Sequence, residues 1–159
     1  MGNHFASYVK PVNLQIGAYQ REANCMQEAL FFEAGDQPSA AKYMVGMVIL
    51  ERVNSDKYAN SVCGVVHQAQ WMGNVPYNCQ FSYYCSPHEV NWKNPVDVTM
   101  WKKCGQIAQV LLSKQFLATI KGKRLTNYHA NYIHPYWSRS NQFKKFAVVG
   151  DQTFYMAEN

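Results

Sequence analysis

The sequence predicts an α+β fold, mostly helical, with a small antiparallel β element near the C-terminus. Apolar residues recur at the spacing of a helix face over most of the chain, and its end alternates around a Gly-containing turn. The chain has 159 residues and neither a repeat nor a low-complexity linker, which favours one domain over residues 1–159.

The first helix is expected from about Arg21 to Ala34, because Gly35 follows at the position where glycine commonly ends a helix. Met26, Leu30 and Glu33 fall on one face of this helix. An acid therefore stands where the pattern calls for a hydrophobic residue.

A second helix is expected after Asp36, which we interpret as its cap, and Pro38, and it should close near residues 54–56. Apolar residues occur on all its sides, so we expect it to be central and buried, with Gly46 permitting the close approach of a neighbour. Its main apolar stripe consists of Ala41, Met44, Val45, Val48, Ile49 and Val53.

Further helical segments follow. A short helical piece is expected at residues 61–68, and residues 73–78, rich in Gly, Pro and Asn, are typical of a connection. The sequence Asn94-Pro95-Val96-Asp97 predicts a helix start with a cap, a first-turn proline and an acid. The apolar stripe of that helix is Val98, Trp101, Cys104, Ile107, Ala108 and Leu111.

The predicted β element is a terminal hairpin with strands at residues 146–149 and 152–156 and Gly150-Asp151 as its turn. Between Lys121 and this hairpin the sequence is irregular and rich in aromatic residues, and the pattern predicts no element there.

Fifteen Lys and Arg against 10 Asp and Glu give a formal net charge of +5. This charge would attract an anionic partner, but it is also ordinary for a solvated surface. No nucleic-acid-binding signature accompanies it, so we expect no nucleic-acid partner. The longest apolar run, residues 44–50, is too short to span a bilayer, so no membrane insertion is expected. We also expect a monomer.

The N-terminus shows no basic start followed by an apolar stretch, so no secretory signal is visible and synthesis in the cytosol is expected. Five cysteines without a C-x-x-C pair argue against a structural zinc site, and the odd count leaves at least one thiol free in a monomer. Cys79 and Cys85 could form a bridge in an oxidising space, or they could be ordinary buried thiols.

Glu33 is the sharpest candidate for chemistry. Burial on an apolar face favours the neutral carboxyl group and would raise its pKa toward the working pH. An acid of that kind can protonate a poor leaving group such as a glycosidic oxygen. The alternative is a structural glutamate in the last helical turn that reaches water or pairs with Arg52.

A conventional glycosidase needs a second carboxylate, about 5 Å from the first for retention or about 6.5–9.5 Å for inversion. If Glu33 is catalytic, it is expected to rely on the substrate instead, because no spacing singles out a partner. The acids available are Asp36, Glu51, Asp56, Glu89 and Asp151.

Four histidines, His67, His88, His129 and His134, raise the alternative of a catalytic zinc. The gap between the last two is not that of the H-E-x-x-H helix, and Pro135 prevents a regular helix from continuing there. No thiol is marked as an activated nucleophile beside a histidine. We therefore predict neither a metal nor a cofactor.

Two segments, residues 80–84 and 127–137, interleave aromatic rings with hydrogen-bonding side chains. Such a mixture suits sugar faces and amide groups, although each ring could equally belong to the core.

Six segments in a fixed order carry a family resemblance: residues 28–37 (EALFFEAGDQ), 45–54 (VGMVILERVN), 61–68 (SVCGVVHQ), 79–82 (CQFS), 128–130 (YHA) and 150–155 (GDQTFY). The series resembles the SleB-type cell wall hydrolases, which include spore-cortex-lytic enzymes and many phage lysins, and it covers about residues 24–155. The family usually carries E-A-R-G-E where this chain has Glu33-Ala34-Gly35-Asp36-Gln37, so an Arg is missing and the second acid is Asp36.

The resemblance implies a lysozyme-like catalytic domain without a separate wall-binding domain. Its substrate would be the glycan strands of peptidoglycan, cut at the β-1,4 bond between N-acetylmuramic acid and N-acetylglucosamine. The enzyme would be a lytic transglycosylase that leaves 1,6-anhydro-muramyl ends, or a muramidase. Glu33 would act first as the general acid and then as the base, with the substrate acetamido group stabilising positive charge. The residues expected to bind the sugar are Gln80, Phe81, Ser82, Tyr128 and His129.

The resemblance also suggests a phage endolysin, made in the host cytoplasm without a signal peptide and released to the cell wall in the periplasm by a separate membrane protein. Two alternatives stay open. One is a zinc-dependent peptidoglycan amidase that uses His129, His134 and a third ligand, and the other is a non-catalytic glycan-binding or structural phage protein.

Overall fold

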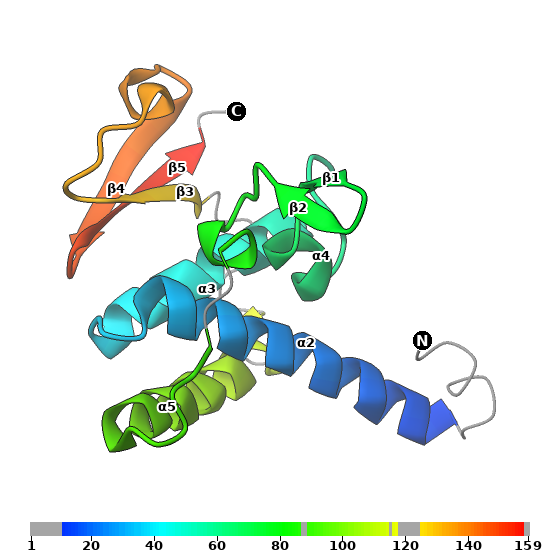
Figure 1. The fold of residues 1–159 in the computed structure, drawn as a ribbon. Coiled ribbons are helices and arrows are strands. Elements are labelled where there is room, and N and C mark those ends of the chain that lie inside the picture. The colour runs from blue at the N-terminus through cyan, green and yellow to red at the C-terminus, as the bar shows by residue number, and fades with distance from the viewer. Residues whose placement is uncertain (1–10, 87–88, 115, 118–124, 158–159) are drawn as a thin grey trace.

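The structure, a computed structural model, describes residues 11–86, 89–114, 116–117 and 125–157. Its three long helices are α2 (Pro11–Ala34), α3 (Ser39–Val53) and α5 (Pro95–Leu111). A three-stranded sheet lies against α3, and a small hairpin lies on the other side of the molecule near the short helix α4 (Val62–Val66) (Figure 1). The predicted α+β class is confirmed.

Helix α2 ends at Ala34 as predicted, but it begins at Pro11 rather than near Arg21. The predicted start was wrong because it left out Val12, Ile16 and Tyr19, which continue the helical spacing of Ala23, Met26 and Leu30 toward the N-terminus. In Figure 1 the first turns of α2 extend beyond the other elements.

Helix α3 is the buried central helix that the sequence predicts. Val45, Val48 and Ile49 are fully buried. A Cβ on Gly46 would lie 2.2 Å from Leu111 Cδ1, so the glycine permits the close approach of α5. The prediction of Asp36 as the cap was wrong: the N-cap position is Pro38, without a side-chain hydrogen bond, because the chain makes one more turn before α3 begins.

The segment after α4 carries more structure than expected. Strands β1 (Gln70–Met72) and β2 (Val75–Tyr77) pair across a turn in which Gly73 has a φ of 62°. The stretch predicted as a connection is therefore partly a hairpin. A short 3-10 helix, η1 (Ser82–Tyr84), follows it. Farther on, the predicted start of α5 is confirmed, because the Asn94 side chain accepts a hydrogen bond from the Val96 N–H at 2.9 Å.

The sheet has the strand order β3–β5–β4 and is antiparallel throughout. Strands β4 (Phe143–Val149) and β5 (Gln152–Ala157) form the predicted hairpin, with Gly150 at a φ of 56° in its turn. Strand β3 (Leu125–Ala130) was not predicted, and it pairs with β5 so that Tyr128 lies opposite Phe154. A second 3-10 helix, η2 (Tyr136–Arg139), connects β3 to β4.

Four of the five cysteines form disulfides. Cys25–Cys63 joins α2 to α4, and Cys79–Cys85 closes the segment that contains η1. The remaining Cys104 is a buried free thiol on α5, and burial raises its pKa to about 11. Of the two alternatives for Cys79 and Cys85, the structure thus has the bridge and not a pair of ordinary buried thiols.

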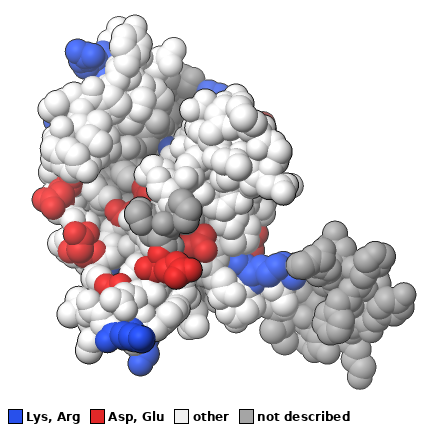
Figure 2. Space-filling model, viewed as in Figure 1, with Lys and Arg blue, Asp and Glu red and all other residues white. Residues whose placement is uncertain are grey.

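Charge is unevenly distributed over the face shown in Figure 2. Asp and Glu side chains gather around its middle, while Lys and Arg side chains lie at its margins. The formal charge of +5 therefore does not form a continuous basic surface on this face. Within the described ranges, no helix combines the length and apolar character needed to cross a membrane.

Candidate active site

Glu33 lies in the last turn of α2. Its side chain is only partly exposed, and burial raises the pKa of Glu33 above its usual value. The hydroxyl of Tyr128 on β3 donates a hydrogen bond to Oε1 of Glu33, which acts on this pKa in the opposite direction. No other residue that the structure describes donates to the carboxyl group, so Oε2 is left for a ligand.

Arg52 lies buried behind this carboxyl group, with 6% of its surface exposed. Its guanidinium carbon lies 5.1 Å from the ring centroid of Tyr58 and 5.4 Å from that of Phe81, and its Nε donates to the carbonyl of Thr126 at 2.9 Å. The positive charge lowers the pKa of Glu33, but the described residues contain no ion pair between the two. The alternative of a structural Glu33–Arg52 salt bridge is therefore not observed.

The structure brings all six predicted site residues together on one cleft of about 420 Å³. The carboxyl end of α2, the segment leading into η1 and strand β3 each supply part of its wall. The predicted residues on it are Glu33, Gln80, Phe81, Ser82, Tyr128 and His129.

The predicted residues differ in how far their side chains are exposed to the cleft. Gln80 and Ser82 are exposed at its edge, whereas Phe81 is only 2% exposed and belongs to the core beneath it. Two further aromatic residues stand at the opening, since Tyr132 is 83% exposed and Trp137 is partly exposed. Such rings and amides along one wall suit a sugar chain.

His129 uses both ring nitrogens within the protein. Its Nδ1–H donates to the carbonyl of Ala130 at 2.8 Å, and Nε2 lies 3.0 Å from the hydroxyl of Tyr155. The ring centroid of His134 is 6.3 Å away. Among the residues with described positions, no three His, Cys, Asp or Glu side chains are grouped to hold a metal ion. His88 lies outside the described residues.

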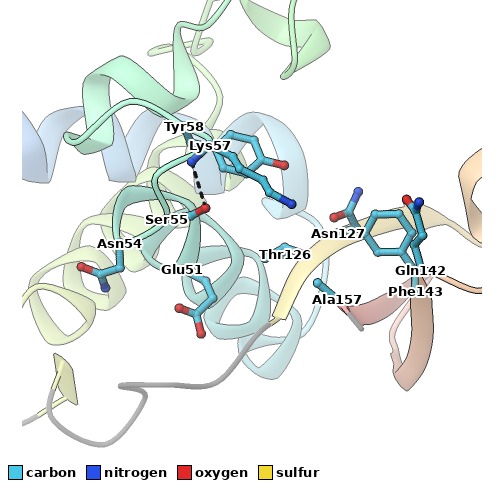
Figure 3. A pocket seen from close by; sticks show the side chains of 10 residues that line it. All are labelled: Glu51, Asn54, Ser55, Lys57, Tyr58, Thr126, Asn127, Gln142, Phe143 and Ala157. Carbon is cyan, nitrogen blue, oxygen red and sulfur yellow. Dashed lines mark hydrogen bonds between the residues drawn. The ribbon is translucent and has the colours of Figure 1, made fainter. Parts of the chain in front are cut away.

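Glu33 is the only Asp or Glu among the described residues that line the cleft. Asp36 is exposed, and Asp151 lies 3.3 Å from the amide nitrogen of Gln37 in a contact between two turns. Glu51 lines a different hollow of about 520 Å³ between the end of α3 and the sheet (Figure 3). The described part of the cleft wall therefore holds no second carboxylate of the kind that a conventional glycosidase uses.

The Cell Wall Hydrolase family model matches residues 36–155, which is most of the chain. The chain belongs to this family. The resemblance to the SleB-type enzymes is thus confirmed, and the protein is a hydrolase that acts on peptidoglycan. No curated protein and no solved structure matches the chain. The family match begins just after Glu33, so the assignment of Glu33 as a site residue depends on its position in the structure.

Several residues that shape the cleft of this cell wall hydrolase were not predicted as site residues. Gln152 at the start of β5 is 6% exposed, and its amide nitrogen donates to the backbone carbonyl of Glu33 at 3.0 Å. It thereby ties the sheet to the end of α2. Arg52 and Asn127 also line the cleft. The only signal for Gln152 and Arg52 was their place inside apolar segments, where a polar residue needs a partner.

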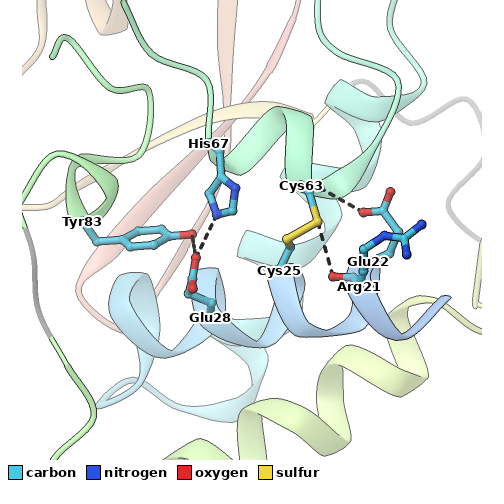
Figure 4. A network of polar contacts seen from close by, with 7 residues as sticks. All are labelled: Arg21, Glu22, Cys25, Glu28, Cys63, His67 and Tyr83. Atoms are coloured by element: carbon cyan, nitrogen blue, oxygen red, sulfur yellow. Dashed lines mark hydrogen bonds and ion pairs between the residues drawn. A yellow bond between two sulfur atoms is a disulfide. The ribbon is translucent and has the colours of Figure 1, made fainter. Parts of the chain in front are cut away.

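A polar network next to the cleft holds η1 against α2 (Figure 4). Glu28 accepts hydrogen bonds from the His67 ring at 2.9 Å and from the Tyr83 hydroxyl at 3.0 Å. The Tyr83 ring stacks on Phe32, with centroids 5.2 Å apart, and Phe32 lines the cleft. The Cys25–Cys63 disulfide lies one turn earlier on α2. In this cell wall hydrolase, hydrogen bonds and a disulfide on the side away from the cleft thus hold this part of the cleft wall in place.

Proposed function

We propose that this cell wall hydrolase is a glycosidase that cleaves the β-1,4 bond between N-acetylmuramic acid and N-acetylglucosamine, with Glu33 as its only catalytic acid. One observation carries the proposal: Glu33 is the only carboxyl group on the described cleft wall, and its burial favours the protonated form that a general acid needs. The family match supports the peptidoglycan substrate.

Tyr128 determines which oxygen of Glu33 acts. Because the Tyr128 hydroxyl donates to Oε1, the carboxyl proton of Glu33, which lines the cleft, sits on Oε2. Oε2 gives this proton to the glycosidic oxygen as the bond from that oxygen to the muramyl C1 breaks. The substrate acetamido oxygen stabilises the positive charge that develops at C1.

The Glu33 carboxylate then acts as the base. In a lytic transglycosylase it takes the proton of the muramyl C6 hydroxyl while that oxygen bonds to C1, which closes a 1,6-anhydro ring and restores the acid. In a muramidase a water molecule takes the place of the C6 hydroxyl. The absence of a second carboxyl group from the described cleft wall favours the first course, because the nucleophile then belongs to the substrate.

Gln80, Ser82, Tyr128 and His129 orient the sugar in this proposal, and Phe81 supports them from beneath. Both disulfides fit an enzyme that works in an oxidising compartment outside the cytoplasm, as a phage endolysin does at the wall.

The decisive experiment digests purified sacculi with wild type and Glu33→Gln and identifies the products by mass spectrometry. We expect the variant to fold normally and to lose activity by about 100-fold to 10,000-fold. Glu89→Gln, the same change at an exposed glutamate outside the cleft, serves as the matched control and should keep its activity. Full activity of Glu33→Gln would overturn the proposal.

The products also separate the possible reactions. Anhydro-muramyl ends, one water lighter than reducing ends, identify a transglycosylase, and reducing ends alone identify a muramidase. New amino groups without new sugar ends, lost on addition of a chelator, would instead identify an amidase. Wall binding without any products would identify a non-catalytic protein.

A further inference from the structure

A second hollow lies directly beside the catalytic cleft and has no role in the reaction described above. Its volume is about 520 Å³, and it opens between the carboxyl end of α3 and the ends of all three sheet strands. Its lining residues are Glu51, Asn54, Ser55, Lys57, Tyr58, Thr126, Asn127, Gln142, Phe143 and Ala157.

The hollow and the cleft are neighbours that share a wall. Asn127 lines both of them. The guanidinium group of Arg52 lies between the ring of Tyr58, which lines the hollow, and the ring of Phe81, which lines the cleft. The distance between the two cavities is therefore only the thickness of this shared wall. A group attached to a substrate in the cleft can reach the hollow by extending across it.

The polar side chains of the hollow converge on one end of it. Figure 3 shows the Lys57 ammonium and the Tyr58 hydroxyl pointing across the opening toward the amides of Asn127 and Gln142, with the ring of Phe143 alongside. Glu51 points away from this end, so its negative charge does not face Lys57. This end of the hollow thus presents one ammonium group, one hydroxyl group and two amide groups. Together these groups can bind a ligand that carries both carboxylate and amide groups.

We propose that this hollow binds the stem peptide of peptidoglycan, with Lys57 pairing with one of its carboxylates. The inference rests on the proposed function, because the stem peptide is attached to the muramic acid residue whose glycosidic bond lies over Glu33. Peptide bonds supply the amide groups and the peptide side chains and end supply the carboxylates. A glycan strand without stem peptides carries only the lactyl carboxylate next to each muramic acid ring, and it has neither peptide bonds for the amides of Asn127 and Gln142 nor a carboxylate farther along a chain for Lys57.

The test compares two substrates: intact glycan strands that carry stem peptides, and the same strands from which an amidase has removed the peptides. Wild type is expected to show a higher kcat/KM on the peptide-bearing strands. Lys57→Gln should lower kcat/KM on those strands about two- to fivefold, as expected for one exposed ion pair, and should leave the peptide-free strands unaffected. Lys144→Gln, at an exposed lysine of β4 that lines neither cavity, is the matched control.

The possible results are distinct. Equal effects of Lys57→Gln on both substrates, or no preference of wild type for the peptide-bearing strands, would overturn the stem-peptide site while leaving the glycosidase intact. A wild type that releases no new sugar ends from either substrate would overturn the proposed function and this inference with it. Added salt should reduce the preference of wild type, because it screens the Lys57 charge.

Discussion

The Tyr128 hydroxyl on β3 donates a hydrogen bond to Oε1 of Glu33 at the end of α2. The sheet and the longest helix thus meet at one carboxyl group. Burial raises the pKa of Glu33, while Tyr128 and the positive charge of Arg52 lower it. The residue can therefore change its protonation state during a reaction instead of being held permanently in one form.

Removing the Tyr128 hydroxyl should shift the pH dependence of the enzyme. Tyr128→Phe deletes a hydrogen bond that stabilises the carboxylate, so the pKa of Glu33 should rise further. The acid step needs protonated Glu33, and activity falls as pH rises through this pKa. The basic limb of the kcat/KM profile on sacculi should therefore move to higher pH.

Tyr155→Phe is the control for this profile, because the Tyr155 hydroxyl contacts His129 and not Glu33. Its basic limb should stay where the wild-type limb lies. A Tyr128→Phe limb that stays in place or moves to lower pH would contradict the assigned role of the hydrogen bond.

The two disulfides should differ in what they support. Cys79–Cys85 encloses the segment with Gln80, Phe81 and Ser82, all on the cleft wall, whereas Cys25–Cys63 joins α2 to α4 behind it. Because stabilisation grows with the length of the closed loop, we expect a loss of about 2 kcal/mol for Cys79→Ala/Cys85→Ala and about 4 kcal/mol for Cys25→Ala/Cys63→Ala.

For substrate affinity we expect the opposite order. Cys79→Ala/Cys85→Ala should weaken the binding of substrate more than Cys25→Ala/Cys63→Ala does. Urea unfolding gives the stabilities, and KM on sacculi reports the affinities at a temperature where both variants remain folded. If both pairs lower affinity only in proportion to stability, the Cys79–Cys85 bridge has no particular role at the cleft.

Local patterns in the sequence predicted the helices better than the sheet. The cap at Asn94 and the stripe of α3 are local signals, and the structure has both. Strand β3 lacks such a signal, because its character comes from pairing with β5, where Tyr128 lies opposite Phe154 far along the chain. The extra turns of α2 before Arg21 were missed even though Val12, Ile16 and Tyr19 continue its helical spacing.

The candidate site shows the same division. Glu33 stood out because an acid occupied an apolar helix face, and the segments with Ser82 and Tyr128 stood out because rings alternate with polar groups. That these residues share one cleft follows from tertiary packing alone. Arg52 follows Val45, Val48 and Ile49 at helical spacing, so its burial could have been predicted as that of Glu33 was, whereas Gln152 begins a strand in which no alternation marks it as buried.

Glu28 should make stability depend on pH in the acid range. Its hydrogen bonds with His67 and Tyr83 lower the pKa of Glu28 in the folded state. A lowered folded pKa adds stability above the unfolded value, about 4.3, and this stability is lost as pH falls through the folded pKa. Wild type should therefore lose more stability than Glu28→Gln between about pH 6 and pH 3.

Urea unfolding at several pH values measures this difference, and Glu89→Gln, at an exposed position, is the control for the substitution itself. Parallel pH curves for wild type and Glu28→Gln would show that the network adds nothing that depends on the charge of Glu28.

Gly46 sets the separation of α3 and α5, and filling its space should destabilise the protein. A Cβ there would lie 2.2 Å from Leu111 Cδ1, and Leu111 is fully buried, so it cannot turn aside without disturbing its neighbours. Gly46→Ala should cost about 1–3 kcal/mol, despite the better helix propensity of alanine. In a Leu111→Ala background the same change should cost less, because the conflicting methyl groups are gone and the cavity can accept the new one. Urea denaturation of the four proteins in this cycle measures the coupling, and strictly additive effects would show that Gly46 and Leu111 do not oppose each other in the core.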